Sequence, residues 1–224
     1  MNESSKRSAG VSPAGPVRIR KRGYLPHWES DRGCYFVTFR LADSLPKSVL
    51  LQMAARKSLL DAAIRSGRKL LPAESVAVAE CSTKKVEDYL DSGSGACLLK
   101  QPRIASVVAR ALLHRNGSDY SLYSWCIMPN HVHAVFRVLS DKPLGSIVHA
   151  WKSYTAKAAN RLLSRSGTLW QREYYDRLIR DDAELHRAIE YVLTNPAKAG
   201  LINWPWVRAY GRTGPAGEDA GATT

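Results

Sequence analysis

The segment YSLYSWCIMPNHVHAVFRVL, residues 120–139, decides the fold because it predicts two neighbouring strands joined by a short connection. Both halves are rich in aromatic and β-branched residues, which favour strands. Pro129-Asn130 between them indicates a turn or bulge. His131 and His133 lie two residues apart on the second strand, so their side chains should share one face. Two imidazoles so placed can bind one metal ion, although a structural histidine pair would show the same spacing.

The flanking sequence predicts the other elements of an α+β domain. Residues 34–42, CYFVTFRLA, predict a strand with Tyr35, Val37, Phe39 and Leu41 on one face. Residues 169–180 predict a fourth strand. Apolar spacing and helix-start and helix-end signals predict four helices: 47–65, 102–115, 142–166, and one that opens at Asp181-Asp182 and ends by about Asn195, before Pro196. This order predicts a ferredoxin-like (RRM-like) antiparallel sheet with helices on one face.

The composition divides the chain into one domain with two flanking segments. Residues 1–22, rich in Ser, Gly, Pro and basic side chains, predict a flexible basic arm. Residues 23–208 form the domain, in which the polar stretch 66–95 is interpreted as a local insertion. Residues 209–224, rich in Gly, Ala and Thr, predict a disordered tail. We expect neither the insertion nor the tryptophan-rich segment NWPWVRAYGR to touch the candidate site.

The charge of the chain indicates a polyanionic partner. The 224 residues carry a formal net charge of +13 and a pI near 9.8, more than solubility requires. The four cysteines stand far apart without a CxxC pair, which argues against a zinc ribbon and a disulfide framework. No apolar run approaches a membrane span, and no signal peptide is apparent. We therefore expect a cytoplasmic, nucleoid-associated protein.

A basic protein with a two-histidine metal site suggests phosphodiester chemistry on a nucleic acid. No compact acidic cluster accompanies the histidines, so a side-chain nucleophile is favoured over water, and tyrosine can form the covalent link. On a helix, a metal ligand four residues from the nucleophile lies on the same face. Tyr191 meets this criterion through Asn195, whereas the rival Tyr154 is followed by Ala158. A buried structural tyrosine would show the same spacing.

Several motifs taken together resemble a known family. They are GYLPHWES, YFVTFRLADSLP, NHVHAVF, WKSYTAKAANR, LWQREYYDRLIRDDAEL and EYVLTNPAKAGL, and they extend from about Arg22 to about Arg208. In order and spacing they resemble the HUH single-strand transposases of the one-tyrosine type, and in detail the REP-associated tyrosine transposases.

The resemblance implies a site and a reaction. His131 and His133 match the HUH metal ligands, Asn195 the third ligand and Tyr191 the nucleophile. The ion implied is Mg²⁺ or Mn²⁺, although imidazoles also suit Zn²⁺ and Ni²⁺. The implied reaction is cleavage and rejoining of single-stranded or hairpin DNA, as in transposition, through a 5′-phosphotyrosine intermediate. The resemblance leaves open whether the protein is a monomer or a homodimer.

The DNA-binding candidates come from the basic segments and from a motif whose aromatic and histidine rings could stack on bases. Helical spacing places four cations on one flank of the 142–166 helix, and the arm and GYLPHWES supply further cations and rings. The candidates are Arg18, Arg20, Lys21, Arg22, Tyr24, His27, Trp28, Lys152, Lys157, Arg161 and Arg165. Two other functions remain open: a non-catalytic nucleic-acid-binding protein derived from such a transposase, and a hydrolase that acts through water.

Overall fold

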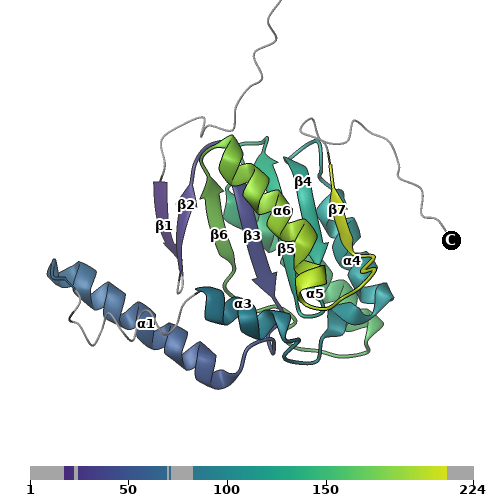
Figure 1. Ribbon diagram of the computed structural model, residues 1–224, viewed down its shortest axis with the longest axis horizontal. Coiled ribbons are helices and arrows are strands. Elements are labelled where there is room, and N and C mark those ends of the chain that lie inside the picture. Colours follow the sequence, from purple (N-terminus) through teal and green to yellow (C-terminus); the bar gives the residue numbers. More distant parts are fainter. Residues whose placement is uncertain (1–17, 23–24, 70, 72–82, 211–224) are drawn as a thin grey trace, which may run out of the picture.

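The computed structural model describes residues 18–22, 25–69, 71 and 83–210, and within them a five-stranded antiparallel sheet is the centre of the fold (Figure 1). The strand order is β6-β3-β5-β4-β7, and a separate hairpin pairs β1 with β2. The strands are β1 (Arg18–Arg22), β2 (Leu25–Glu29), β3 (Cys34–Arg40), β4 (Tyr120–Ile127), β5 (His131–Val138), β6 (Tyr175–Ile179) and β7 (Val207–Ala209). The helices are α1 (Lys47–Ser66), α3 (Thr83–Asp91), α4 (Pro102–Leu113), α5 (Leu144–Leu162) and α6 (Asp182–Lys198), with a 3₁₀ turn at Leu98–Lys100.

The β4-β5 hairpin forms as the sequence predicts. Residues 128–130 make the turn, which closes when the amide of Met128 donates to the carbonyl oxygen of His131 over 2.8 Å. The bulge lies elsewhere, at Tyr123 in the middle of β4, where the pairing with β5 shifts by one residue. The carbonyl of this bulged residue accepts a hydrogen bond from the amide of Tyr210 at 2.8 Å, which ties the chain after β7 to the sheet.

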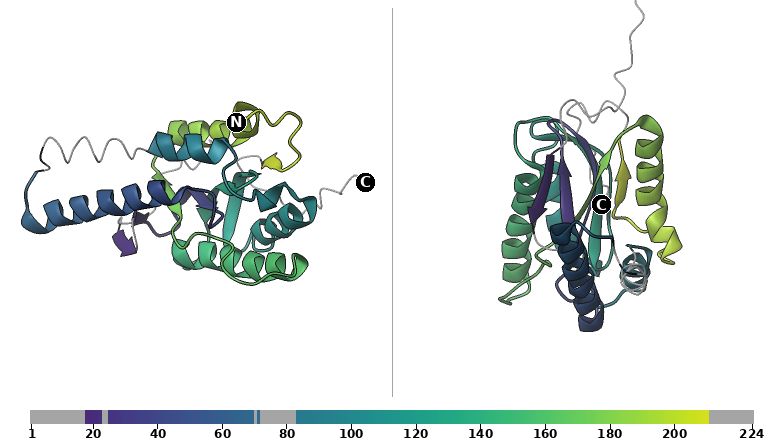
Figure 2. Two further views of the ribbon diagram at one scale, coloured as in Figure 1. Left: turned by 90° about the horizontal axis from the view of Figure 1, so that it is seen from below. Right: turned by 90° about the vertical axis from the view of Figure 1, so that its left-hand side faces the viewer.

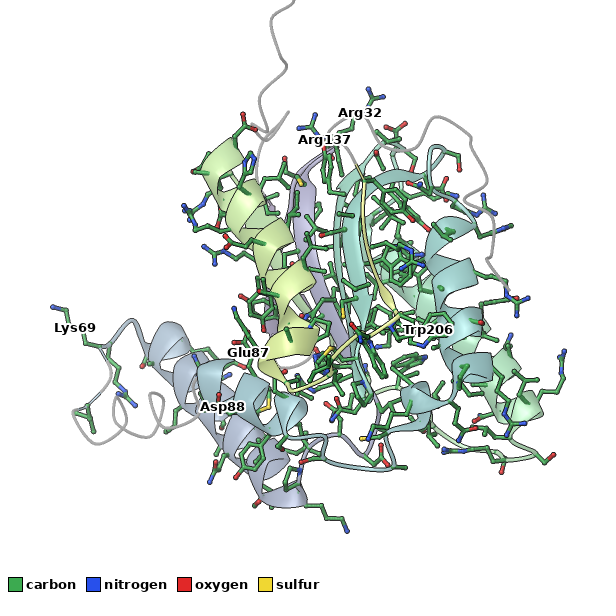
Figure 3. The ribbon with its side chains drawn as sticks, turned by 45° about the vertical axis from the view of Figure 1, so that its right-hand side comes forward. Arg32, Lys69, Glu87, Asp88, Arg137 and Trp206 are labelled. Atoms are coloured by element: carbon green, nitrogen blue, oxygen red, sulfur yellow. The ribbon has the colours of Figure 1, made fainter. Side chains whose placement is uncertain are left out.

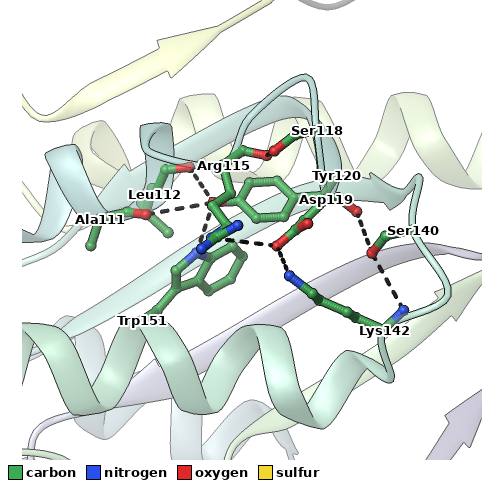
Figure 4. A network of polar contacts seen from close by, with 9 residues as sticks. All are labelled: Ala111, Leu112, Arg115, Ser118, Asp119, Tyr120, Ser140, Lys142 and Trp151. Carbon is green, nitrogen blue, oxygen red and sulfur yellow. Dashed lines mark hydrogen bonds and ion pairs between the residues drawn. The ribbon is translucent and has the colours of Figure 1, made fainter.

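One face of the sheet packs against α4 and α5 (Figure 2). Phe136 of β5 is fully buried there, and its ring lies 5.5 Å from the ring of Tyr120 and 5.1 Å from that of Trp151. The indole of Trp151 donates to the Tyr120 hydroxyl at 2.9 Å, and this hydroxyl donates to the carbonyl oxygen of Leu112 at 2.7 Å (Figure 4). Polar groups carried into this core are thus satisfied within it.

The opposite face packs against α6, which corrects the expectation of helices on one face only (Figure 2). The reason lies in β5, where both sets of alternating side chains are buried, Val132 and Phe136 on one face and His131, His133 and Val135 on the other. A sheet buried on both faces needs cover on both sides. The α+β class and the antiparallel sheet are as predicted.

Three further expectations change. Arg18–Arg22 are strand β1 and not part of a flexible arm, while residues 1–17 lie outside the described part of the chain. Within the insertion, Thr83–Asp91 form helix α3. Helix α6 continues through Pro196 to Lys198, because one missing N–H removes a single hydrogen bond from a helix that is otherwise packed on the sheet.

Several boundaries also differ from the sequence prediction. Helix α5 is shorter than 142–166, and only Tyr175–Ile179 of the segment 169–180 pair as a strand, although Trp170 forms an isolated bridge with Leu41. The segment expected to be a tail begins inside β7, and residues 211–224 are not described.

The ring cluster around Phe136 gives a test of the core. Phe136→Ala removes a fully buried ring and should lower the free energy of unfolding by about 3–5 kcal/mol. Leu51→Ala, on α1 and 70% exposed, should change it by less than about 0.5 kcal/mol. Both values come from equilibrium denaturation in urea, and equal effects of the two substitutions would contradict the assigned core.

Candidate active site

His131 and His133 meet on the α6 side of the sheet. Each side chain is about 1% exposed, and their Nε2 atoms lie 2.9 Å apart. Strand β5 brings them together by its two-residue repeat, as the sequence predicts. Phe36 of β3 stacks on the His133 ring with centroids 5.4 Å apart, which holds that ring on the sheet.

The neighbours of each ring leave Nε2 directed at a shared point. Asn130 donates through Nδ2 to the carbonyl oxygen of Ser94 at 2.9 Å, so its Oδ1 accepts from Nδ1–H of His131 at 2.7 Å. Nε2 of His131 therefore carries a lone pair. Nδ1 of His133 lies 2.8 Å from the hydroxyl of Thr38. Metal-binding histidines are oriented in this manner by partners on the second ring nitrogen.

Both histidines favour the neutral form. Burial lowers the pKa of His133 to about 3. Burial also lowers the pKa of His131 well below its ordinary value, and the nearby His133 and Arg40 lower it further. Since only a neutral imidazole offers a lone pair, the site is ready to bind a cation at neutral pH without first losing protons.

Helix α6 carries Tyr191 to the histidines. The helix begins at Asp181, whose Oδ1 accepts from the amide of Glu184 at 2.7 Å, a standard N-cap. The Tyr191 ring lies edge-on to His133, with centroids 5.4 Å apart, and the ammonium of Lys198 lies 5.5 Å from its centroid. The rival Tyr154 lies on α5, on the opposite face of the sheet, and is 56% exposed.

Asn195 follows one turn after Tyr191 on the same helix and is completely buried. Among the described residues, neither Oδ1 nor Nδ2 of its side chain makes a hydrogen bond of ordinary geometry, although Asp91 and Tyr191 lie close enough for the amide to lower the pKa of each. A buried amide without partners is costly, and such exceptions are concentrated at functional sites. Its carbonyl oxygen is thus available as a ligand.

These donors suit a divalent metal ion. Two neutral imidazoles favour ions such as Zn²⁺, Fe²⁺ or Ni²⁺, while an amide oxygen suits Mg²⁺ or Mn²⁺. Within the described residues, no group of three or more His, Cys, Asp or Glu side chains is arranged to hold a metal ion. A third protein ligand beside the histidines would therefore be an amide such as that of Asn195.

Helix α3 touches this site, which corrects the expectation that the insertion lies away from it. The helix lies beside the C-terminal end of α6, and Figure 3 labels Glu87 on it. Burial raises the pKa of Tyr191, and the negative charges of Glu87 and Asp91 raise it further. Burial also raises the pKa of Asp91, and the nearby Asn195 amide partly offsets that rise. Acidic groups do accompany the site, against the interpretation of the sequence.

The tryptophan-rich segment supports the turn that precedes the histidines. The indole of Trp204 donates to the carbonyl oxygen of Ile127 at 2.7 Å, and the amide of Ile127 donates to the carbonyl oxygen of Trp206 at 2.8 Å. The segment therefore fixes the end of β4, three residues before Asn130. The Trp204 side chain also packs against the same hydrophobic cluster as Tyr191.

The DNA-binding candidates are not gathered around the histidines. Lys157, Arg161 and Arg165 are exposed on or after α5, which packs on the other face of the sheet. Lys152, also on α5, donates to the carbonyl oxygens of Gln171 and Arg172. In the hairpin beside β6, only the backbone is described for a set of candidates: Arg18, Arg20, Lys21, Arg22, His27 and Trp28. Tyr24 lies outside the described residues.

Four residues near the site were not predicted: Thr38, Arg40, Glu87 and Asp91. The strand alternation of 34–42 carried part of the signal, since it separates Thr38 and Arg40 from the face of Tyr35 and Val37. The alternation alone does not show which strand pairs with this one, so it could not place Thr38 and Arg40 beside the histidines. The two acids of α3 had no signal in the local sequence.

The geometry defines a class of protein: an α+β domain with a buried two-histidine centre and a helix-borne tyrosine next to it. Residues 103–195 match the family model described as "Transposase IS200 like", a segment that includes His131, His133, Tyr191 and Asn195. Over these residues the chain is similar to the IS200-like transposases, in agreement with the resemblance to the REP-associated tyrosine transposases that its motifs indicate.

Individual proteins are also similar to this chain. A Haemophilus influenzae protein provisionally named a REP-associated tyrosine transposase is 28% identical over 95 residues, 36% of this chain and 54% of the relative. An uncharacterized protein of the same species is 28% identical over 92 residues, 31% and 51% of the two chains. The chain spans about half the length of these curated relatives. A solved REP-associated tyrosine transposase bound to a REP hairpin has a TM-score of 0.45 and 15% identity over 84% of this chain and 80% of that one.

The described part of the chain has no helix that is both long and apolar enough to span a membrane.

The acids of α3 give a test of the site. Glu87→Gln combined with Asp91→Asn removes two negative charges that disfavour the phenolate, so the pKa of Tyr191 should fall. Ultraviolet titration of the phenolate, with the Tyr191→Phe protein subtracted, measures that pKa. Asp88→Asn removes one negative charge on the exposed side of α3 and should leave the pKa nearly unchanged. A Tyr191 pKa that does not respond to the double substitution would show that α3 lies away from the hydroxyl.

Proposed function

We propose that this protein is a metal-dependent endonuclease and strand-transferase, a transposase of the REP-associated tyrosine type, which acts on single-stranded hairpin DNA through a 5′-phosphotyrosine intermediate. The observation that carries the proposal is the position of Tyr191 against His133, one helical turn before the fully buried Asn195, whose amide makes no hydrogen bond of ordinary geometry among the described residues. The match of residues 103–195 to the IS200-like transposases supports it. The net charge of +13 suits a DNA partner.

The reaction is a transesterification at one phosphodiester. The hydroxyl oxygen of Tyr191 attacks the phosphorus in line, the bond from phosphorus to the 3′-oxygen breaks, and the 3′-oxygen takes up a proton. The phenol proton must leave at the same time, and the Glu87 carboxylate, which already perturbs the pKa of Tyr191, is suited to accept it. The 5′-phosphate stays on Tyr191, so the same step in reverse joins it to a 3′-hydroxyl without an external energy source.

His131, His133 and Asn195 would hold the metal ion. When bound, Mg²⁺ or Mn²⁺ would neutralise charge on the scissile phosphate and orient its oxygens. Asn130 and Thr38 keep the two imidazoles turned toward the ion by their contacts with Nδ1. The Phe36 ring packs against both His133 and Tyr191, with centroids 5.4 and 5.7 Å away, and the sheet closes the site on the side away from α6.

The covalent step gives the primary test. Incubation with labelled hairpin single strands and Mn²⁺ should yield a protein–DNA complex that survives denaturation, and Tyr191→Phe should abolish it because the nucleophilic oxygen is lost. Tyr154→Phe, the matched change on the far face, should leave it at the wild-type amount. A complex that persists in Tyr191→Phe and disappears in Tyr154→Phe would show that Tyr154, and not Tyr191, is the nucleophile.

The same assay separates the other two functions. Binding without any covalent complex, across varied hairpins, would support a non-catalytic nucleic-acid-binding protein. Cleaved DNA with nothing attached to the protein would support a hydrolase that acts through water.

Metal binding provides a second prediction that needs no DNA. Calorimetric titration with Mn²⁺ should show one site, which His131→Ala weakens by at least about 100-fold and Thr38→Val by about 10-fold. His149→Ala, an exposed histidine on α5, should have no effect. Because the pKa of His133 is lowered to about 3, the affinity should stay level as the pH falls from 8 to about 5, where ordinary imidazoles become protonated. Equal affinity in His131→Ala would exclude this site.

A further inference from the structure

Arg40 lies on the same face of the sheet as the two histidines. It is the last residue of β3, and its direct partner across the β3-β5 pair is His131. Cross-strand partners hold their side chains close together. The side chain is 5% exposed, a degree of burial similar to that of His131 itself. A DNA strand that reaches the histidines therefore passes the guanidinium as well.

The contacts of Arg40 leave its charge without a counterion. Its Nε donates to the amide oxygen of Gln171 at 2.6 Å, and its Nη2 contacts the sulfur of Met53 on α1 at 3.8 Å. Both partners are neutral, and no described carboxylate lies within ion-pair distance of Arg40. A buried cation normally pairs with an anion, because desolvation is costly. Burial lowers its pKa to about 10, and Glu173 opposes this only from farther away.

A second cation and an unused donor lie beside Arg40. The ammonium of Lys152 donates to the carbonyl oxygens of Gln171 and Arg172 at 2.7 and 2.8 Å. Burial, and more weakly the positive charge of Arg40, lower the pKa of Lys152 to about 8, while Glu173 raises it. The side-chain amide nitrogen of Gln171, Nε2, is buried and has no hydrogen-bond partner among the described residues. Arg40, Lys152 and Gln171 thus form a cationic corner with a free N–H donor.

We infer that the cationic corner, formed by Arg40, Lys152 and Gln171, binds a backbone phosphate of the DNA strand next to the phosphate that is cleaved. The inference rests on the proposed function and adds to it a site that positions the strand. A phosphate supplies both the negative charge that the corner lacks and acceptor oxygens for the guanidinium fork and the Gln171 amide. Arg40 touches the strand, and Lys152 holds the 171–172 backbone in place while adding positive charge.

Single neutral phosphates give the test. Hairpin oligonucleotides, each with one uncharged methylphosphonate at a successive position, are bound to the protein in a Tyr191→Phe background, where no covalent step occurs, and anisotropy reports the affinity. One methylphosphonate near the cleavage position should weaken binding roughly tenfold. With Arg40→Gln added, the fully charged strand should bind about as weakly, and that methylphosphonate should cause no further loss.

Two controls separate this role from a structural one. Arg110→Gln makes the same change of charge on the exposed side of α4 and should leave the dependence on that phosphate intact. Arg40→Lys keeps the charge and should retain part of the dependence, which also covers the case in which Arg40→Gln melts at a lower temperature. An equal methylphosphonate effect in Arg40→Gln and in the Arg110→Gln control would overturn the inference.

The outcome is distinct from that of the proposed function. If the wild-type protein never forms an adduct but the phosphate dependence disappears when Arg40 is changed, the cationic corner is supported and the catalysis is refuted. Adduct formation with a phosphate dependence that ignores Arg40 would do the reverse.

Discussion

Antiparallel pairing of β3 with β5 sets Thr38 opposite His133 and Arg40 opposite His131. The strands also bury both of their faces, so every side chain in this pair must find its partners inside the protein. On the face toward α4 and α5 the solution is apolar and aromatic. On the face toward α6, an apolar cluster surrounds a polar layer made of two imidazoles, a hydroxyl and a guanidinium. The candidate site is this polar layer, and the stability of the site depends on the apolar layer behind it.

The polar layer contains more hydrogen-bonding and charged groups than it satisfies. Among the described residues, the two Nε2 atoms of the histidines face each other, the Asn195 amide makes no hydrogen bond of ordinary geometry, and the Arg40 charge has no carboxylate within ion-pair distance. A cation between the imidazoles would satisfy the two Nε2 atoms, and an anion beside Arg40 would balance its charge. A metal ion and a phosphodiester together have these charges, and Tyr191 lies on the helix that closes the layer. The unsatisfied groups of this face are thus those that the proposed reaction would satisfy.

Local pattern was enough to predict the elements that form the site. The two-residue repeat placed His131 and His133 on one face, and helical spacing placed Tyr191 one turn before Asn195; the structure brings Tyr191 to His133, 5.4 Å between ring centroids. Contacts between distant segments were not predictable. Burial on both faces of β5, which puts α6 opposite α4 and α5, depends on the whole sheet, and Glu87 reaches Tyr191 from a stretch that is polar and irregular in composition. The predicted end of the last helix before Pro196 was wrong, because packing of α6 on the sheet outweighs the local preference of proline.

The central claim is that the histidine strand and helix α6 meet around one metal ion. Fe²⁺ can replace Mg²⁺ or Mn²⁺ at such a site, and with ascorbate and peroxide it produces radicals that cut the backbone only close to the ion. The account predicts two sets of cuts, at residues 130–133 and at residues 191–195, both suppressed by excess Mn²⁺ and both lost in His131→Ala. Cuts in the histidine strand alone, with α6 intact, would contradict it.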